Sequence, residues 1–224
     1  SLRGESSAIA HYPQYTSLLA DTKIEAVIIA AVSGLHAEMA KQSLLAEKHV
    51  ILEKPMTLSL EEADELIQLA EQKNLKLMVC HQMRHRPIMK KIKETIAEGK
   101  LGKPYLGAVS LRLNRSPAYY AAASWRGSWE KDGGMLINQG IHLIDLLQWF
   151  LGDVTSVYGE ILTAAPGKET EDVAAGILTF ANGAKGIIEA NIVTQPNNLG
   201  SSLSIFGENG TISLEGPSFN RISR

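Results

Sequence analysis

The chain has 224 residues, of which 45% are hydrophobic and 21% are charged, and this composition excludes a disordered, fibrous or disulfide-scaffold protein. Lysine and arginine (22) nearly balance aspartate and glutamate (24), so the formal net charge of -2 provides no basic field for a nucleic acid or an anionic membrane. A chain of this length can bury a core and form one or two domains.

Cysteine content and the length of apolar runs bear on location. Cys80 is the single cysteine, which excludes an intrachain disulfide and a metal site with several cysteine ligands. No apolar run approaches the roughly 20 residues that cross a bilayer, and the first residues do not have the layout of a signal peptide. We therefore expect a cytoplasmic protein that binds neither nucleic acid nor membrane.

The first part of the chain alternates short apolar runs with amphipathic helices, a pattern typical of parallel strands joined by crossovers. It predicts strands at 26–32, 49–53 and 75–80, and helices at 36–48 and 60–73. Ser59 is the expected N-cap of the second helix, with Glu62 at the capping-box position and Asn74 as the stop signal. This order is a βαβαβ arrangement.

The second part begins with a predicted helix at 87–98, ended by Gly99, and then changes to long alternating strands. One further helix should begin near Asn138 and end at Gly152. Asn182-Gly183 and Asn209-Gly210 are hairpin signals, so most of the strands should form an antiparallel sheet. The strands are predicted at 105–114, 154–163, 173–180, 184–193, 203–206 and 211–214.

These elements predict an α/β plus α+β fold class. Residues 1–83 should form part of a Rossmann-like parallel sheet, and residues 84–224 a domain with a large, mainly antiparallel open sheet. A parallel sheet of three strands leaves an edge that a neighbouring strand normally covers, and the last segment ends without a closing element. We therefore expect a chain that lacks part of each domain.

The dinucleotide fingerprint G-x-G-x-x-G is absent, because no two of the 19 glycines are separated by a single residue. The loop that brings a helix N-terminus to a pyrophosphate is therefore not in this sequence. A P-loop is absent too, which argues against an NTPase.

Glu53-Lys54-Pro55 follows the second predicted strand at its carboxyl end, the edge where open α/β sheets bind ligands. A lysine there can donate a proton or stabilise negative charge, and Pro55 would restrict the backbone. The alternative interpretation is a solvated charge pair before a turn.

The run from His81 to Arg86 follows the third predicted strand. His81 and His85 have the spacing of two metal ligands on a helix, but no carboxylate or third histidine lies nearby in the sequence. A polar loop that lines a cofactor cleft explains the run better, and we predict no metal site.

Tyr119-Tyr120 and the Trp125–Trp129 run concentrate aromatic residues in a chain that has few of them. The segment 114–132 is too polar and irregular for a core element, and a loop of that length is usually functional. The rings could instead anchor the loop to the sheet, and both interpretations can hold together.

The segment from Gly133-Gly134 to Asp145 carries the densest set of polar groups. On a helix that begins near Asn138, the side chains of Asn138, His142 and Asp145 share one face. A histidine with a carboxylate one turn away can act as a general acid or base with an orienting partner. The two glycines favour a ligand contact, because they allow close approach of the backbone. The alternative is the wet face of a mostly apolar helix.

Together these motifs resemble the Gfo/Idh/MocA family of NAD(P)-dependent sugar oxidoreductases. The resemblance implies an N-terminal Rossmann domain, whose phosphate loop would precede this chain, and a C-terminal α/β domain. The open sheet of the second domain would carry one face of the active site and an oligomer interface. In chain order, the matching features are Val27-Ile28-Ile29-Ala30 leading to Gly34-Leu35-His36, Glu53-Lys54-Pro55, Trp125-Arg126, and the Gly-Gly…Asn-x-Gly-x-His-x-x-Asp segment.

The resemblance also implies roles for single residues. Lys54 would contact the reacting hydroxyl and the nicotinamide ribose, and His142 would take the hydroxyl proton as hydride leaves. Asn138, Tyr120 and Arg126 would bind the substrate. The residues implied at the NAD or NADP site are Ser33, His36, Glu53, Lys54, His81, Gln82, Trp125 and Arg126.

Two positions depart from the common family pattern. Asn138 stands where aspartate is typical of inositol and simple sugar dehydrogenases, and resembles the nucleotide-sugar branch of UDP-N-acetylglucosamine-type 3-dehydrogenases. Because an amide cannot accept a proton as a carboxylate can, Asn138 should position the substrate while Lys54 and His142 carry the proton chemistry. Val32-Ser33 stands where Pro-Asn is common, which affects the cofactor contacts.

The resemblance therefore favours an NAD(P)-dependent dehydrogenase that acts on a CH-OH group of a sugar or nucleotide sugar, as a homodimer or homotetramer. Two alternatives stay open: a non-catalytic regulatory protein that senses sugars on the same fold, and an inositol or simple sugar dehydrogenase. The sequence leaves both NAD and NADP open as the cofactor.

Overall fold

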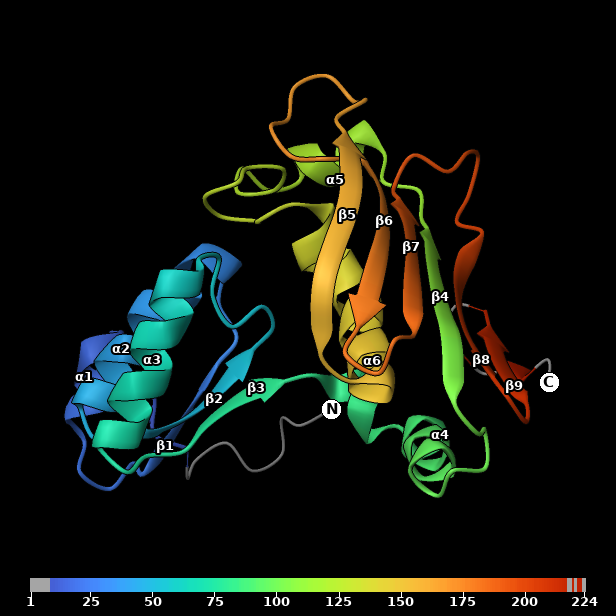
Figure 1. The fold of residues 1–224 in the computed structure, drawn as a ribbon. Coiled ribbons are helices and arrows are strands. Elements are labelled where there is room, and N and C mark those ends of the chain that lie inside the picture. The colour runs from blue at the N-terminus through green and yellow to red at the C-terminus, as the bar shows by residue number, and fades with distance from the viewer. Residues whose placement is uncertain (1–8, 217–218, 220, 223–224) are drawn as a thin grey trace. The chain divides into compact units, whose positions relative to one another are not determined.

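The computed structural model describes residues 9–216, Phe219 and residues 221–222. The chain forms two compact units (Figure 1). The described part of the first consists of residues 9–31 and 35–80, and that of the second of residues 32–34 and the chain from residue 81 onward. Each unit has a hydrophobic core of its own.

The first unit is built on a parallel sheet of three strands, in the order β1-β2-β3. Helices α2 and α3 are the two crossovers, which confirms the βαβαβ prediction. The elements are α1 (Tyr15–Ala20), β1 (Ala26–Ile29), the 3-10 turn η2 (Ser33–Leu35), α2 (His36–Leu45), β2 (His49–Glu53), α3 (Leu60–Gln72) and β3 (Leu77–Cys80).

One face of this sheet is buried against the helices. Alternate residues of β1 and β2 point into that core, as the period of a strand requires. On the opposite face the side chains of Ile28 and Met78 are 71% and 45% exposed. The buried cluster consists of Val27, Ile29, Ala40, Leu44, Val50, Leu52, Leu66 and Ala70.

The predicted ends of α3 are confirmed. The Ser59 hydroxyl accepts a hydrogen bond from the backbone N–H of Glu62 at 3.1 Å, and Asn74 follows the helix with φ of 53°. Asparagine tolerates this left-handed conformation, which stops a helix. Helix α2 ends at Leu45, three residues before the predicted end, and Glu47 there has φ of 60°.

The second unit is built on a sheet of seven strands in the order β10-β9-β8-β4-β7-β6-β5. Every neighbouring pair is antiparallel except β4 and β7, so the predicted mainly antiparallel sheet is confirmed. The strands are β4 (Pro104–Arg112), β5 (Val154–Leu162), β6 (Val173–Phe180), β7 (Lys185–Asn191), β8 (Gly200–Gly207), β9 (Thr211–Glu215) and β10 (Arg221–Ile222).

Both predicted hairpin turns are present. At Asn182-Gly183 the glycine has φ of 87°, and its N–H donates to the carbonyl of Phe180 at 2.9 Å. At Asn209-Gly210 the N–H of Gly207 donates to the Gly210 carbonyl at 2.8 Å. These turns join β6 to β7 and β8 to β9.

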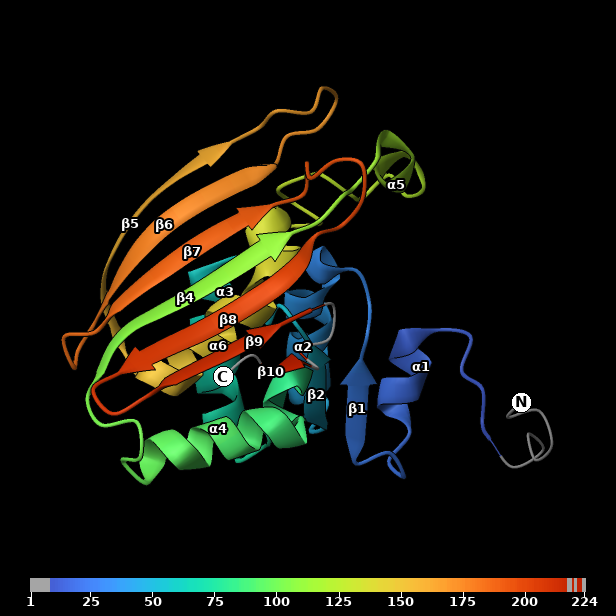
Figure 2. The same cartoon turned by 90° about the vertical axis from the view of Figure 1, so that its right-hand side faces the viewer.

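Helices α4 (Pro87–Ala97) and α6 (Ile141–Leu151) lie on one side of the curved sheet (Figure 2). Helix α6 packs closely on the central strands because these carry glycine beneath it. A Cβ atom at Gly107 would lie 2.4 Å from Cδ1 of Leu147, and one at Gly186 would lie 3.3 Å from Cδ2 of the same leucine. Leu146 and Leu147 are fully buried in this layer.

Some elements differ from the prediction. Strand β8 begins at Gly200, three residues before the predicted start, because Gly200 pairs with Arg112 of β4. The prediction missed this start because Gly200-Ser201-Ser202 shows no alternation of apolar and polar residues. Strand β1 ends at Ile29, opposite Leu52, and not at residue 32. The helical turns η3 (Gln82–His85) and α5 (Pro117–Ala121) were not predicted, and neither was α1. In the described part of the chain no helix is long and apolar enough to span a membrane.

Replacing Ser59 by alanine should lower the free energy of unfolding by about 1 kcal/mol, because the backbone N–H of Glu62 loses its acceptor. Chemical denaturation measures the change. Ser59→Thr is the control, since it keeps a hydroxyl at the cap. An alanine variant as stable as the unmodified protein would contradict the capping role.

Candidate active site

Lys54 lies directly after β2, at the carboxyl edge of the first unit's sheet. Glu53, the last residue of β2, pairs in register with Cys80 of β3. The Glu53 Oε2 atom accepts a hydrogen bond from the backbone N–H of Lys54 at 3.2 Å. Both side chains are half-buried. A carboxylate and an ammonium group therefore stand at the predicted strand end.

The thiol at this edge is less acidic than usual. Burial and, to a smaller extent, the Glu53 carboxylate raise the pKa of Cys80. The thiol therefore stays protonated at neutral pH, and its chemistry is that of a small packing group.

His36 holds the backbone around Lys54 in place. Its side chain is buried, with Nδ1 2.7 Å from the carbonyl oxygen of Pro55 and Nε2 3.1 Å from that of Ala31. An N–H on either ring nitrogen therefore donates to a backbone carbonyl, at the end of β1 or just beyond β2. This places His36 beside Lys54, and its direct contact with a cofactor stays a prediction.

The residues that follow β1 and β3 belong to the second unit. The N–H of Gly34 donates to the carbonyl of Lys131 at 3.1 Å, and a Cβ atom at Gly34 would lie 2.6 Å from the carbonyl oxygen of Glu130. The segment with Ser33, which is half-buried, thus packs tightly on the loop before Gly133. After β3, His81 is half-buried and Gln82 is exposed.

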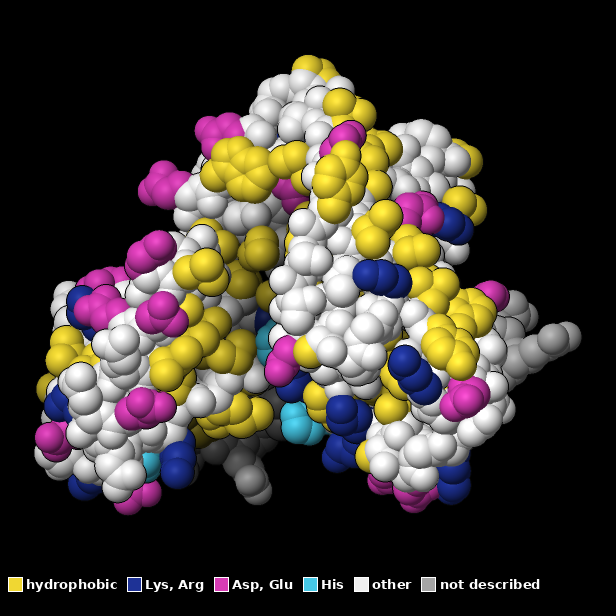
Figure 3. Space-filling view, viewed as in Figure 1, with side chains coloured by type: hydrophobic (Ala, Val, Ile, Leu, Met, Phe, Trp, Pro, Cys, Tyr) yellow, Lys and Arg dark blue, Asp and Glu magenta, His cyan; other side chains and the backbone are white. Residues whose placement is uncertain are grey.

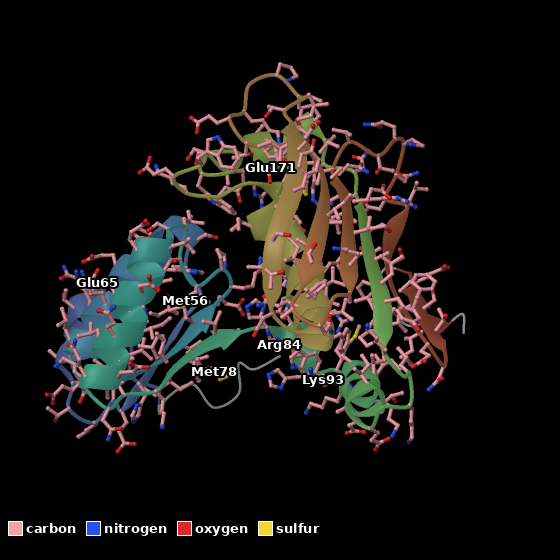
Figure 4. All side chains as sticks on the ribbon, viewed as in Figure 1. Met56, Glu65, Met78, Arg84, Lys93 and Glu171 are labelled. Atoms are coloured by element: carbon pink, nitrogen blue, oxygen red, sulfur yellow. The ribbon has the colours of Figure 1, made fainter. Side chains whose placement is uncertain are left out.

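The Asp145 carboxylate of α6 is bound by residues that follow β3. Arg84 donates to it twice, from Nε to Oδ2 at 2.9 Å and from Nη2 to Oδ1 at 2.5 Å. The Nδ1 atom of His81 lies 3.3 Å from the same carboxylate. Figure 4 labels Arg84 near the base of the second unit. The orienting role of Asp145 toward His142 stays a prediction, since the carboxylate serves Arg84 and His81.

The helix that carries His142 begins with a π turn, η4 (Leu136–Gly140), and continues as α6. A π turn adds a residue to one helical turn and is frequent at functional sites. Periodicity did not predict it, because an apolar pattern over five residues does not distinguish the two kinds of turn. Asn138 lies within this turn, and His142 is the second residue of α6.

Gly134, the second of the two glycines before this turn, meets a carboxylate of the protein itself. Gly134 has φ of 93°, and a Cβ atom there would lie 2.2 Å from Oε2 of Glu171. The other oxygen of Glu171 accepts the N–H of Leu136 at 2.7 Å. Glu171, labelled in Figure 4, is 2% exposed. The close approach that the sequence suggested for a ligand is therefore made at Gly134 by Glu171.

Asn138 is positioned by a second buried carboxylate, that of Asp132. The amide nitrogen of Asn138 donates to Oδ1 of Asp132, and the N–H of Gly127 donates to Oδ2 at 2.8 Å. The Asn138 amide oxygen accepts a hydrogen bond from Gln139 at 3.3 Å. The amide is thus oriented before any substrate is present, as a positioning role requires.

The loop rich in aromatic residues holds Arg126 by stacking and by its backbone. The Arg126 guanidinium lies 4.0 Å from the ring centroid of Tyr119 and 5.3 Å from that of Trp125, and its Nη1 donates to the Tyr119 carbonyl at 2.7 Å. Burial and the nearby Asp172 carboxylate raise the pKa of the Tyr120 hydroxyl above 10.0, so this group is a hydrogen-bond donor at neutral pH.

Asp132 and Glu171 are two buried carboxylates of the candidate site that the sequence did not single out. Asp132 stands directly before the double glycine, a position that could have indicated it. Glu171 carries no such signal, because it lies 35 residues from its partner Leu136. In the described residues no group of three or more histidine, cysteine, aspartate or glutamate side chains could hold a metal ion.

Comparison with known proteins finds two matching family models. Residues 3–81 match a model described as "Oxidoreductase family, NAD-binding Rossmann fold", and residues 89–213 match one described as the GFO/IDH/MocA C-terminal domain. Together the two matches cover nearly the whole chain.

Relatives and solved structures agree with these matches. The structure is similar to the WlbA dehydrogenase from Bordetella pertussis, solved with NADH and UDP-GlcNAcA, with a TM-score of 0.91 and 36% identity over 95% of this chain and 62% of that one. An uncharacterized oxidoreductase of Synechocystis is 34% identical over 91% of this chain and 58% of its own length. A scyllo-inositol 2-dehydrogenase (NADP(+)) of Bacillus subtilis is 35% identical over 68% of this chain and 42% of its own length. The chain thus spans less than two thirds of each of these proteins.

Replacing Gly134 by alanine should destabilise the protein by more than replacing Gly152, although both have φ near 94°. Strain in the left-handed region costs about 1–3 kcal/mol at either position. At Gly134 the new methyl group would also displace the Glu171 carboxylate, whereas a Cβ atom at Gly152 has no neighbour within 4 Å. Thermal or chemical denaturation compares the variants, and equal losses would contradict the contact between Gly134 and Glu171.

Proposed function

Because this chain belongs to the GFO/IDH/MocA oxidoreductase family, we propose that the protein oxidises a secondary hydroxyl group of a sugar or nucleotide sugar by hydride transfer to a nicotinamide dinucleotide. The observation that carries the proposal is Lys54 at the carboxyl end of a parallel strand, held by Glu53 and by the His36 contact to Pro55. His142 at the start of α6 supplies the second group that the reaction needs.

The residues at the strand ends suit the nicotinamide end of such a cofactor. The Glu53 carboxylate is a half-buried acceptor, and Lys54 beside it is a donor, so both can bind ribose hydroxyl groups. We propose the same role, as cofactor contacts, for Ser33, His36, His81, Gln82, Trp125 and Arg126. The glycine-rich loop that would bind the pyrophosphate of the cofactor is not in this sequence, because the chain contains no G-x-G sequence.

The proton chemistry belongs to the chain's own residues. A bound nicotinamide would supply the acceptor for the hydride that leaves the carbon of the hydroxyl group. His142 accepts the hydroxyl proton as the C–H bond breaks and the carbonyl forms, and returns it in the reverse direction. The Lys54 ammonium donates a hydrogen bond to the same oxygen and stabilises the charge that develops on it.

Asn138, Tyr120 and Arg126 bind the substrate in this proposal. The amide group of Asn138 is oriented by Asp132 and can form hydrogen bonds with a sugar hydroxyl, but it cannot remove a proton. Such an arrangement fits a dehydrogenase that acts on a nucleotide sugar, such as the UDP-GlcNAcA in the WlbA complex, better than one that relies on an aspartate base. A cytoplasmic location stays a prediction.

We also propose that the open face of the seven-stranded sheet is an oligomer interface. Tyr158, Ile177 and Ile187 lie side by side on β5, β6 and β7, and are 67%, 53% and 43% exposed. In Figure 3 hydrophobic side chains gather over this region of the second unit. A contiguous apolar row of this kind is typical of an interface between subunits.

Replacing Lys54 by methionine or His142 by asparagine in the full-length protein should lower kcat/KM by about 10²–10⁴, because each removes a group that acts on the hydroxyl. Dinucleotide binding, followed by calorimetry, should persist. Turnover is measured by nicotinamide absorbance with a panel of sugars and UDP-sugars.

Lys23→Met and His11→Asn are the matched controls, since both residues are exposed and distant in sequence from the site. Full activity in both site variants would overturn the assignment. An unmodified protein that binds dinucleotide and turns over no sugar on the panel would favour a sugar-sensing regulatory protein.

Replacing Ile177 by lysine should reduce the oligomeric mass in solution, because it puts a charge into the centre of the proposed interface. Light scattering coupled to size exclusion measures the mass. Val157→Lys is the control: Val157 is 70% exposed, but it points to the opposite face of the sheet from its neighbour Tyr158. An unchanged mass for Ile177→Lys would contradict this interface.

A further inference from the structure

A cavity of about 450 Å³ lies within the second unit, between the loop after β4 and the loop after β5. Its volume is in the range of small-molecule sites, roughly 300–1,000 Å³. Three cationic side chains, those of Arg115, Arg126 and Lys168, line it together with Tyr120, and its lining includes no carboxylate.

The two arginines are held in place but have no anionic partner among the residues that the structure describes. Their guanidinium groups lie 5.1 Å (Arg115) and 4.0 Å (Arg126) from the ring centroid of Tyr119. One Nη1 donates to the carbonyl of Asn114 at 2.9 Å and the other to that of Tyr119 at 2.7 Å. Both Nε atoms are buried without a hydrogen-bond partner among the described residues.

The acidic groups near the cavity already have partners. Asp172 forms an ion pair with Lys168 at 2.7 Å and accepts hydrogen bonds from the N–H groups of Ala164 and Ala165, each at 2.7 Å. Asp132 accepts from Gly127 and Asn138. The charge of Lys168 is thus balanced within the protein, whereas those of Arg115 and Arg126 are not balanced by any ion pair in the described part of the chain.

An anion from outside the protein would stabilise this pair of arginines. A half-buried charge without a partner is costly, because it loses hydration and gains nothing in return. The planar fork of a guanidinium suits the oxygen atoms of a phosphate or carboxylate group. Two uncompensated positive charges match the charge of a diphosphate better than that of one carboxylate.

The position of the cavity relates it to the substrate residues of the same unit. Arg115 and Tyr120 also line a narrow hollow that extends to Asn138 and Gln139. This hollow has a volume of about 10 Å³, room for about one water molecule, so it is not a passage for a ligand. Arg115 and Tyr120 belong to both linings, so the cavity borders on the residues around Asn138, and this arrangement suits a molecule with an anion at one end and a sugar at the other.

We propose that this cavity binds the diphosphate of a nucleotide-sugar substrate, through the guanidinium groups of Arg115 and Arg126. The proposal rests on the proposed function, and it narrows the substrate from sugars in general to nucleotide sugars. Arg115 then determines specificity: it binds the part of the substrate that does not react.

Calorimetry with UDP tests this directly, because binding of UDP needs no turnover. The full-length protein should bind UDP, and Arg115→Gln should weaken the binding about ten- to a hundredfold, the effect of losing a charge-assisted hydrogen bond. Arg115→Lys should be intermediate, since it keeps the charge and loses the fork. Arg112→Gln, which removes an arginine already paired with Glu189, should leave UDP binding unchanged.

Steady-state kinetics give the second readout. Arg115→Gln should raise KM for a UDP-sugar by a similar factor with kcat little changed, and should leave KM for myo-inositol as it is. Arg126→Gln should also weaken UDP binding, so the proposal can still be tested if Arg115→Gln does not fold. Circular dichroism checks the fold of each variant.

Several results would overturn the subsite. Equal UDP binding by the folded Arg115→Gln variant and the unmodified protein is one. Binding of glucuronate that depends on Arg115, without binding of UDP, is another, because the cavity would then recognise a carboxylate. Turnover of myo-inositol without UDP binding would support the proposed oxidoreductase activity and reject the subsite.

The opposite result separates the two proposals. UDP binding that depends on Arg115, without turnover of any sugar, would keep the subsite and reject the activity.

Discussion

Buried carboxylates organise the second unit, because a charge taken out of water must be paired or hydrogen-bonded. Asp172 forms an ion pair with Lys168 and binds two backbone N–H groups of the loop after β5. Asp132 binds Asn138, and Glu171 binds the backbone at the start of η4. Loops that are far apart in the sequence are thereby connected to the helix of His142. The polar groups at this end of the unit are therefore oriented in the absence of ligand, as a specific site requires.

Arg115 and Arg126 depart from this rule, and the departure distinguishes a binding cavity from the surrounding structure. Their guanidinium groups are oriented by the Tyr119 ring and by backbone carbonyls, while their charge is left for an external anion. In the first unit, Lys54 likewise lies on backbone that other side chains hold in place. The backbone beside it is held by His36 and Glu53, so the ammonium group stands on a rigid strand end.

Much of the fold follows from local sequence signals. Alternating apolar runs predicted the parallel strands, and β2 and β6 begin and end at the predicted residues. Ser59 and Asn74 mark the ends of α3 because capping and left-handed stop conformations depend on single side chains. The motif at Glu53-Lys54 was recognised for the same reason: a strand end is local information, and open sheets bind ligands at that edge.

By itself, the sequence determined most of the strands and longer helices, the two kinds of sheet and the local positions of Lys54 and His142. The tertiary structure alone decided which distant groups meet: Arg84 with Asp145 across 61 residues, and Glu171 with the start of η4 across 35. It also decided the parallel pairing of β4 with β7. Periodicity repeats over a few residues and identifies a buried face, but it does not identify the partner. That choice depends on how the folded layers bring buried charges and strand edges together.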